Sequence, residues 1–293
     1  MNLGLIRRAA LLAAPVFTAI SLLVPAPAQA AGGEAPLDAF PVEKLNDRSA
    51  LQHGAQLFVN YCMGCHSLKS MRYNRLQDLG LTDQQIRDNL LFTGEKVGDM
   101  MTIPMQAADA KAWFGALPPD LSVTARARSS HAGTGSDWIY TFLRSFYRDN
   151  GRATGWNNTV FPNVGMPNPF WALQGVQAMT ATDIKAEGDG HGASFTQTVT
   201  HYGADGSVTV TEGKPSSDHP HVGRHTEFEP AQGGTLDRLA FDQAVGDLTA
   251  FLTYVSDPSA KTRTALGVWV LIFLSVLFAI SIWLNRTFWK DIK

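Results

Sequence analysis

The chain has 293 residues, a formal net charge of −2 and only two cysteines. Residues 31–260 carry 17 Lys and Arg against 25 Asp and Glu, a charge of −8, because the remaining basic residues lie near the two ends. This acidic stretch is long enough for one elaborated domain, argues against nucleic-acid binding and suits a basic soluble partner, although plain solubility explains the charge equally well.

The N-terminus has the features of an export signal. Arg7 and Arg8 precede an uncharged apolar run at 11–24, and Ala28-Gln29-Ala30 fits the small-x-small pattern of a signal-peptidase site. We interpret residues 1–30 as a cleaved signal. The domain that follows, residues 31–260, would then lie outside the cytoplasmic membrane.

Two helices are predicted, one directly before the cysteines and one late in the domain. The first has apolar or small residues at helical spacing from Leu51 to Cys62, with Asp47 or Ser49 available as N-cap. The second repeats the period from Phe241 to Val255, and Pro258 follows as a stop signal. Together they resemble the crossed terminal helices of class I c-type cytochromes, with Gly54 allowing close backbone approach. Periodicity alone predicts only a mostly helical, loop-rich domain.

Both cysteines fall in one short motif, Cys62-Met63-Gly64-Cys65-His66. A disulfide here would close too small a loop to stabilise much, and a redox-active dithiol is the remaining alternative. Cys-x-x-Cys-His is, however, the attachment signature of haem c, with the two thiols forming thioethers and the His becoming an iron ligand. The motif therefore predicts one covalently attached haem c.

A methionine is the expected ligand on the opposite side of the iron. Met166 lies in "NNTVFPNVGMPNPFW", a loop whose prolines and glycine restrict the backbone and favour rigid presentation of a ligand. Met101 and Met105 are the next candidates. A methionine that merely fills a gap beside the haem is the alternative interpretation.

A polar region at about 181–234 is predicted to be an insertion. The segment "SFTQTVTHYGADGSVTVTEG" alternates Thr and Val about an Ala-Asp-Gly turn, which predicts a two-stranded hairpin. Metal binding by His219, His221 and His225 with Asp218 is conceivable, but the loop lacks the rest of a recognised site.

A transmembrane helix is predicted at 264–285. This run has no charge and is long enough to cross a hydrocarbon core of about 30 Å. Trp269 and Trp283 lie near its two ends, and the short basic tail at 286–293 predicts a cytoplasmic C-terminus. A buried core helix is the alternative.

The chain resembles the cytochrome c1 family of the cytochrome bc1 complex. The resemblance rests on "GALPPDLSVTARAR" at 115–128, "CMGCHSLKSMRYNRL", "FPNVGMP", the acidic domain and the single C-terminal anchor. It implies that Cys62, Cys65 and His66 hold the haem and that Met166 is the sixth ligand. It also implies that a Pro carbonyl accepts a hydrogen bond from Nδ1–H of His66, and we choose Pro118 for this role. It further implies that Arg126 forms an ion pair with a haem propionate. A solvated surface Arg is the alternative for Arg126.

The implied fold is mainly α: a class I cytochrome c-like haem domain with long loops and a β-hairpin insertion, plus one C-terminal transmembrane helix. The implied function is electron transfer from a Rieske iron–sulfur subunit to a soluble c-type cytochrome, alongside cytochrome b in a dimeric complex. The complex would be a quinol:cytochrome c oxidoreductase in a bacterial cytoplasmic membrane, with the haem domain in the periplasm and no substrate chemistry in this chain. The alternatives are a free-standing anchored carrier that serves a terminal oxidase and a haem enzyme with an open distal site.

Overall fold

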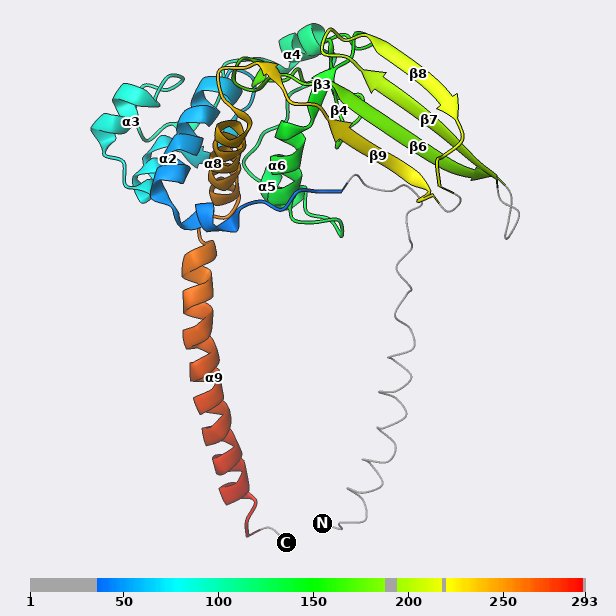
Figure 1. Ribbon diagram of the computed structural model, residues 1–293. Coiled ribbons are helices and arrows are strands. Elements are labelled where there is room, and N and C mark those ends of the chain that lie inside the picture. The colour runs from blue at the N-terminus through cyan, green and yellow to red at the C-terminus, as the bar shows by residue number, and fades with distance from the viewer. Residues whose placement is uncertain (1–35, 188–193, 218–219, 292–293) are drawn as a thin grey trace. The chain divides into compact units, whose positions relative to one another are not determined.

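The computed structural model describes residues 36–187, 194–217 and 220–291 (Figure 1). The chain divides into two compact units. One is Gly33–Pro258, and the other consists of Met1–Gly32 and Ser259–Lys293. The predicted export signal, residues 1–30, lies outside the described residues.

Two helices from opposite ends of the larger unit pack against each other: α2 (Arg48–Leu57) and α8 (Arg238–Ser256). Asp47 caps α2, its side chain accepting from backbone N–H groups in the first turn, and Asp237 caps α8 in the same way. Both predicted helices are thus confirmed. The assignment to the class I cytochromes stays a prediction.

Gly54 is the point of closest approach between these helices. A Cβ atom built on Gly54 would lie 2.1 Å from the backbone oxygen of Asp247 and 2.8 Å from Cβ of Phe251. No side chain fits at these distances, so glycine sets how closely the two backbones approach. The expected role of Gly54 is confirmed.

Shorter helices complete the helical part of this unit. Helices α5 (Thr124–Ala127) and α6 (Gly135–Arg144) contact α8. At Gly135, the first residue of α6, an added Cβ would lie 2.0 Å from the backbone oxygen of Ala125 in α5. The shorter helical segments of the described chain are η1 Val42–Asn46, η2 Phe58–Cys62, η3 Tyr73–Leu79, α3 Asp83–Asn89, α4 Ala107–Phe114, α5 Thr124–Ala127, α6 Gly135–Arg144 and α7 Trp171–Gln174.

Three small antiparallel ladders tie the loops to the helices. Each consists of two strands: β1 (Leu68–Arg72) with β2 (Met100–Met101), β3 (Phe146–Arg148) with β4 (Trp156–Asn158), and β5 (Gly175–Val176) with β10 (Gln232–Gly233). The first two flank the candidate site described below, because β1 follows the Cys-His motif and β4 begins the Met166 loop.

A four-stranded antiparallel sheet stands in place of the predicted two-stranded hairpin. Strands β7 (Ser194–Tyr202) and β8 (Val208–Gly213) pair around the predicted turn, so that part of the prediction is confirmed. Strands β6 (Met179–Glu187) and β9 (Gly223–Phe228) extend the sheet to the order β8-β7-β6-β9. In Figure 1 it lies at the opposite end of the unit from α3. A small cluster of Tyr147, Met179, Ala181, Tyr202 and Phe228 joins it to the β3 ladder.

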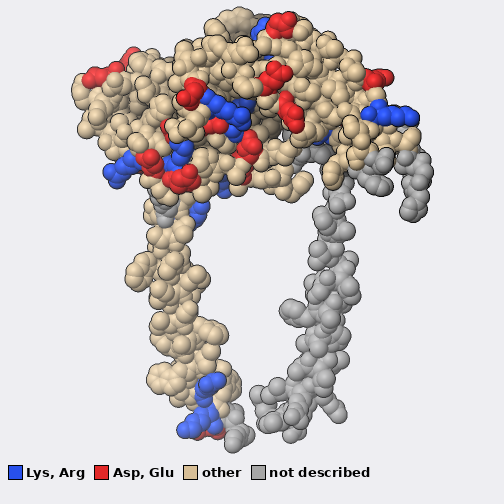
Figure 2. Space-filling view, in the orientation of Figure 1, with Lys and Arg blue, Asp and Glu red and all other residues tan. Residues whose placement is uncertain are grey.

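The main core lies around α2 and α8. Fully buried side chains include Phe58, Leu76, Leu248 and Phe251, and this cluster also takes in Cys62 of the motif. On the face drawn in Figure 2, acidic and basic side chains of this unit lie interspersed. The net acidic charge is therefore not visible as one continuous patch on that face.

The second unit contributes one long described helix, α9 (Ala260–Phe288). Its segment Thr262–Phe288 has a mean hydropathy of 2.6, and none of its most apolar stretch is buried by protein. A helix of this length and composition is a candidate membrane span. Its large apolar side chains are exposed, which favours a membrane span over the alternative of a buried core helix.

Candidate haem-attachment site

The Cys-x-x-Cys-His motif follows a change of helical geometry. Helix α2 continues directly into the π-helical turn η2, in which the Met63 N–H donates to the Phe58 carbonyl at 2.9 Å. The Cys62 carbonyl then accepts from the N–H groups of Cys65, at 3.0 Å, and His66, at 2.9 Å. This compact turn places both thiols and the imidazole directly after a rigid helix. Wide helical turns of this kind are frequent at functional sites.

The imidazole of His66 is oriented by a proline carbonyl. Nδ1 of His66 lies 2.7 Å from the carbonyl oxygen of Pro119. A carbonyl oxygen can only accept, so Nδ1 carries the proton and Nε2 keeps the lone pair that a metal requires. Burial lowers the pKa of His66, whereas the Pro119 carbonyl and the Asp120 carboxylate oppose this shift.

The acceptor is Pro119 and not Pro118, so our choice within the Pro-Pro pair was wrong by one residue. The backbone contacts that follow explain this register. The Leu121 N–H donates to the Ser67 carbonyl at 3.0 Å, which aligns the segment after the prolines with the segment after His66. This contact holds the two segments side by side, with Pro119 two residues before Leu121 and His66 one residue before Ser67.

The two cysteines have the chemistry that thioether attachment requires. Both are free thiols, Cys62 buried and Cys65 partly exposed, and no disulfide joins them. Burial, with a smaller contribution from Cys65, raises the pKa of the Cys62 thiol to about 12. Two unpaired thiols beside a His with a free Nε2 fit a covalently bound haem.

The three candidate methionines differ in how the protein uses them. Met101 is fully buried and lies opposite Leu68 in the β1–β2 ladder, so its thioether is occupied in core packing. Met105 is partly buried. Met166 is partly buried at the edge of the core cluster that also contains Cys62. Met166 alone of the three combines partial exposure with packing against the cluster that contains Cys62, which favours it.

Two buried asparagines, which the sequence analysis missed, hold the Met166 loop. Asn158 is fully buried, and its Oδ1 accepts from the N–H groups of Val160 at 2.9 Å and Phe161 at 3.1 Å. Asn157 Oδ1 accepts from the Asn163 N–H at 2.8 Å. Side-chain amides thus replace the backbone pairing that an irregular loop lacks. The Asn-Asn pair at the start of "NNTVFPNVGMP" was the available sequence signal.

Replacing Asn158 by Ala should destabilise the protein by about 3 kcal/mol or more, because it leaves several buried groups without partners. Besides the two N–H groups, Asn158 donates to the Phe142 carbonyl at 2.7 Å. In a unit of this size the loss corresponds to roughly 6–12 °C in Tm, measurable by thermal unfolding of the detergent-solubilised protein.

Asn163→Gly is the matched control in the same loop. Asn163 has a φ of 63°, which glycine adopts freely, and its bond to Asn157 uses the backbone N–H that glycine retains. We expect a Tm within a few degrees of the wild type, because substitutions of exposed residues that keep the backbone conformation usually change stability little. Equal losses in both variants would contradict the network.

The two arginines after the Pro-Pro segment behave differently. Arg126 is exposed in α5 and forms no ion pair with the described residues, so its guanidinium is available to an external anion. Arg128 instead lies over the rings of Trp138, at 4.3 Å, and Phe161, at 5.4 Å. Cation–π contacts of this kind link Arg128 to the Met166 loop. The propionate contact of Arg126 stays a prediction.

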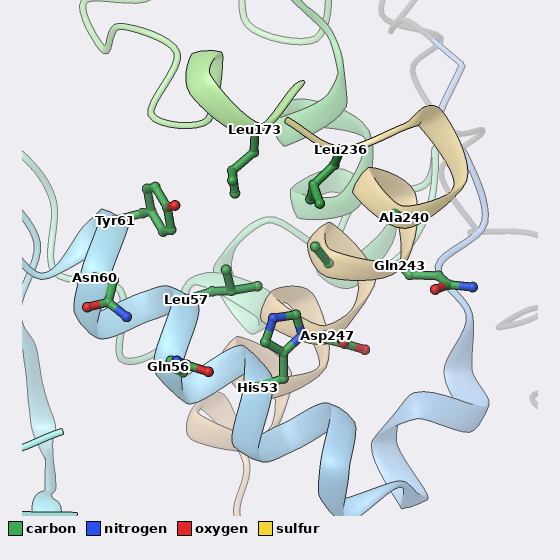
Figure 3. Close-up of a pocket in the computed structure, with 11 residues that line it drawn as sticks. His53, Gln56, Leu57, Asn60, Tyr61, Leu173, Leu236, Ala240, Gln243 and Asp247 are labelled. Carbon is green, nitrogen blue, oxygen red and sulfur yellow. Dashed lines mark hydrogen bonds and ion pairs between the residues drawn. The ribbon is translucent and has the colours of Figure 1, made fainter. Parts of the chain in front are cut away.

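A cavity of about 500 Å³ opens elsewhere, beside α2 and α8 (Figure 3). On its rim, Nδ1 of His53 lies 2.7 Å from a carboxylate oxygen of Asp247, which also pairs with Lys44. The cavity is lined by His53, Gln56, Leu57, Asn60, Tyr61, Leu173, Leu236, Ala240, Gln243, Ala244 and Asp247. None of the predicted haem ligands is among these residues.

The histidines of the polar region do not assemble a metal site in the described part of the chain. His221 lies in a loop, and His225 in β9 is 3.2 Å from a carboxylate oxygen of Glu227. Asp218 and His219 lie outside the described residues. Within the described ranges no three His, Cys, Asp or Glu side chains gather to hold a metal ion.

Comparison with known proteins gives consistent matches over most of the chain. A family model described as "Cytochrome C1 family" matches residues 40–200 and 234–292. A protein named cytochrome c1 from Allochromatium vinosum is 38% identical, covering 92% of this chain and 96% of the relative. A protein named ammonia monooxygenase gamma subunit from Nitrosomonas europaea is 35% identical, covering 92% and 95%. The mitochondrial cytochrome c1 haem protein of Saccharomyces cerevisiae is 24% identical, covering 96% and 78%.

Proposed function

Because this chain belongs to the cytochrome C1 family, we propose that it passes single electrons from a Rieske iron–sulfur protein to a soluble c-type cytochrome within a cytochrome bc1 complex. Proteins of this family are redox subunits of that complex, an oxidoreductase, and bind one covalently attached haem c. The observation that carries the proposal is the His66 imidazole, held by Pro119 directly after two free thiols.

The proposed haem-binding residues have distinct roles. Cys62 and Cys65 would form the two thioether bonds, and Nε2 of His66 would bind the iron. Met166 would supply the opposite ligand, and Arg126 would pair with a propionate. Haem held by His and Met alternates between ferric and ferrous iron at a relatively high potential. The protein keeps the imidazole in one tautomer, holds the Met166 loop rigid with buried amides and encloses Cys62 in its core.

The proposed topology has one membrane span. Helix α9 would anchor the protein in a bacterial cytoplasmic membrane, with the haem domain in the periplasm and the C-terminal tail in the cytoplasm. The apolar run at 11–24, the exposed apolar surface of α9 and the basic residues after it support this orientation. Cytochrome b and the Rieske subunit would be the permanent partners in a dimeric assembly.

The hairpin region is proposed to be an insertion in the haem domain. Residues 201–233, which include β8 and β9, are not matched by the family model, whereas the sequence on both sides is. These strands are the two outer strands of the sheet, and neither contains a residue of the candidate haem site. Their deletion should therefore be less harmful than deletion of a matched segment.

Purification in mild detergent followed by optical spectra and subunit identification tests the function. We expect a c-type spectrum, haem that resists extraction by acid acetone, and stable association with a dihaem b cytochrome and an iron–sulfur subunit. Isolation of the red protein without these partners would instead indicate a free-standing carrier. Carbon monoxide binding by the ferrous protein would indicate an open distal site, as a haem enzyme requires.

A chain ending at Pro258 should be released from the membrane as a soluble, red protein. The residues removed contain the whole of α9, whereas the unit Gly33–Pro258 keeps both core helices and every proposed haem residue. The measurement is the distribution of covalent haem between soluble and membrane fractions when the partner subunits are absent. Retention in the membrane under those conditions would contradict a single anchor.

A further inference from the structure

We propose that Asp120 is a positioning residue for the haem, one that fixes the Pro119 carbonyl against His66 and biases the iron toward the ferric state. This inference rests on the proposed function. It concerns a side chain that binds neither haem nor iron and acts through the contact between Pro119 and His66.

The Asp120 carboxylate joins the two segments that meet at the candidate site. Oδ2 accepts from the Lys69 N–H at 2.7 Å, and Oδ1 accepts from the Ser122 N–H at 3.0 Å. Lys69 lies three residues after His66, and Asp120 directly follows Pro119. One ionised side chain therefore connects the chain after the imidazole to the chain after its acceptor, by hydrogen bonds of the strong, charge-assisted kind.

Neighbouring contacts extend this connection into a short clamp. The Leu121 N–H donates to the Ser67 carbonyl at 3.0 Å, and the Ser70 N–H donates to Oγ of Ser122, also at 3.0 Å. These bonds alternate along the two segments, so neither segment slides past the other while they hold. The distance of 2.7 Å between Nδ1 of His66 and the Pro119 oxygen is set by this register.

The charge of Asp120 has a second consequence. Asp120 directly follows the residue whose carbonyl accepts from His66, so its negative charge stabilises positive charge on the imidazole and on the iron bound to it, and the ferric state has one more positive charge than the ferrous state. A firm hydrogen bond from Nδ1–H to a carbonyl acts in the same direction, because it makes the ligand more basic. Asp120 should therefore lower the reduction potential of the haem.

The test compares three variants of the full-length protein in detergent. Asp120→Asn removes the charge and one of the two acceptor oxygens. Ser122→Ala removes only the Ser70 contact and leaves the charge. Asp109→Asn removes one carboxylate from an exposed side chain of α4 that forms none of the clamp's hydrogen bonds, and controls for net charge. The readouts are covalent haem content, the redox midpoint, and the low-spin ferric electron paramagnetic resonance spectrum, which responds to the orientation of the imidazole.

We expect Asp120→Asn to keep its covalent haem, to raise the midpoint potential and to shift the resonance spectrum. Ser122→Ala should shift the spectrum with a smaller change of potential, and Asp109→Asn should change neither. A purely structural role predicts only a lower Tm, so an Asp120→Asn protein with wild-type potential and spectrum overturns the proposal.

If the Asp120→Asn protein does not accumulate, the Ser122→Ala protein provides the test. A wild-type resonance spectrum and midpoint potential in Ser122→Ala would then overturn the proposal as well. Failure of the proposed function has a different signature, because the wild-type protein itself would then contain no covalent haem.

Discussion

Replacing Met166 by Leu should lower the haem reduction potential, open the iron to carbon monoxide and leave the haem covalently attached. A neutral thioether is a soft ligand that stabilises ferrous iron, so its loss favours the ferric state. Axial-ligand identity moves haem potentials over about 0.8 V, and we expect a decrease that is a sizeable part of that range. Electron delivery from the iron–sulfur partner would then be unfavourable, and turnover of the complex should collapse.

Leucine is the informative replacement because it keeps the apolar volume of Met166 at the edge of the core cluster. Volume-conserving apolar substitutions usually cost less than ~1.5 kcal/mol, so lost activity would not reflect unfolding. The weak near-infrared absorption of ferric iron bound to Met sulfur should vanish, which can be recorded together with the redox titration.

Met101→Leu is the matched control, since Met101 is fully buried in the same cluster. It should keep the near-infrared band, the potential and the resistance to carbon monoxide. If Met166→Leu retains these three properties, Met166 is not the ligand. Loss of them in Met101→Leu or Met105→Leu would then identify the true one.

The parts of the fold that sequence predicted are those in which local chemistry determines the structure. Asp47 begins α2 because its carboxylate accepts from the N–H of Ser49 at 2.8 Å, a contact encoded within three residues. The helical period from Phe241 to Val255, with Pro258 after it, likewise predicted the ends of α8 to within a few residues. The Cys62-to-His66 motif needed no tertiary information, since its turn closes on its own backbone.

The parts that sequence missed depend on contacts between distant residues. Pro118 and Pro119 are chemically equivalent, and the choice of Pro119 depends on the contacts between residues 120–122 and the segment after His66. The Asn158 network depends on Phe142, sixteen residues earlier in the chain. Strand β9 has the sequence Gly-Arg-His-Thr-Glu-Phe, too polar to alternate visibly, and becomes a strand because β6 offers it an edge.

The region around Gly54 should respond strongly to an added methyl group. In Gly54→Ala the new Cβ would lie 2.1 Å from the Asp247 carbonyl oxygen, a distance that real Cβ atoms do not show. Because that oxygen belongs to the backbone of α8, relief requires the helices to separate. Separation loosens the contact between the rings of Phe58 and Phe251, now 5.9 Å apart, and strains the pairing of Asp247 with Lys44 and His53.

We expect Gly54→Ala to cost about 4 kcal/mol or more, at the upper end of single-substitution effects, although alanine is the better helix former. The effect should reach the haem, because α2 runs without a break into the turn that holds Cys62. Covalent haem per protein, from a haem stain and an immunoblot of the same gel, should therefore fall together with Tm. Gly98→Ala is the control, since an added Cβ there meets nothing within 4 Å. A Gly54→Ala protein with wild-type Tm and haem content would show that the two helices do not pack as closely as described.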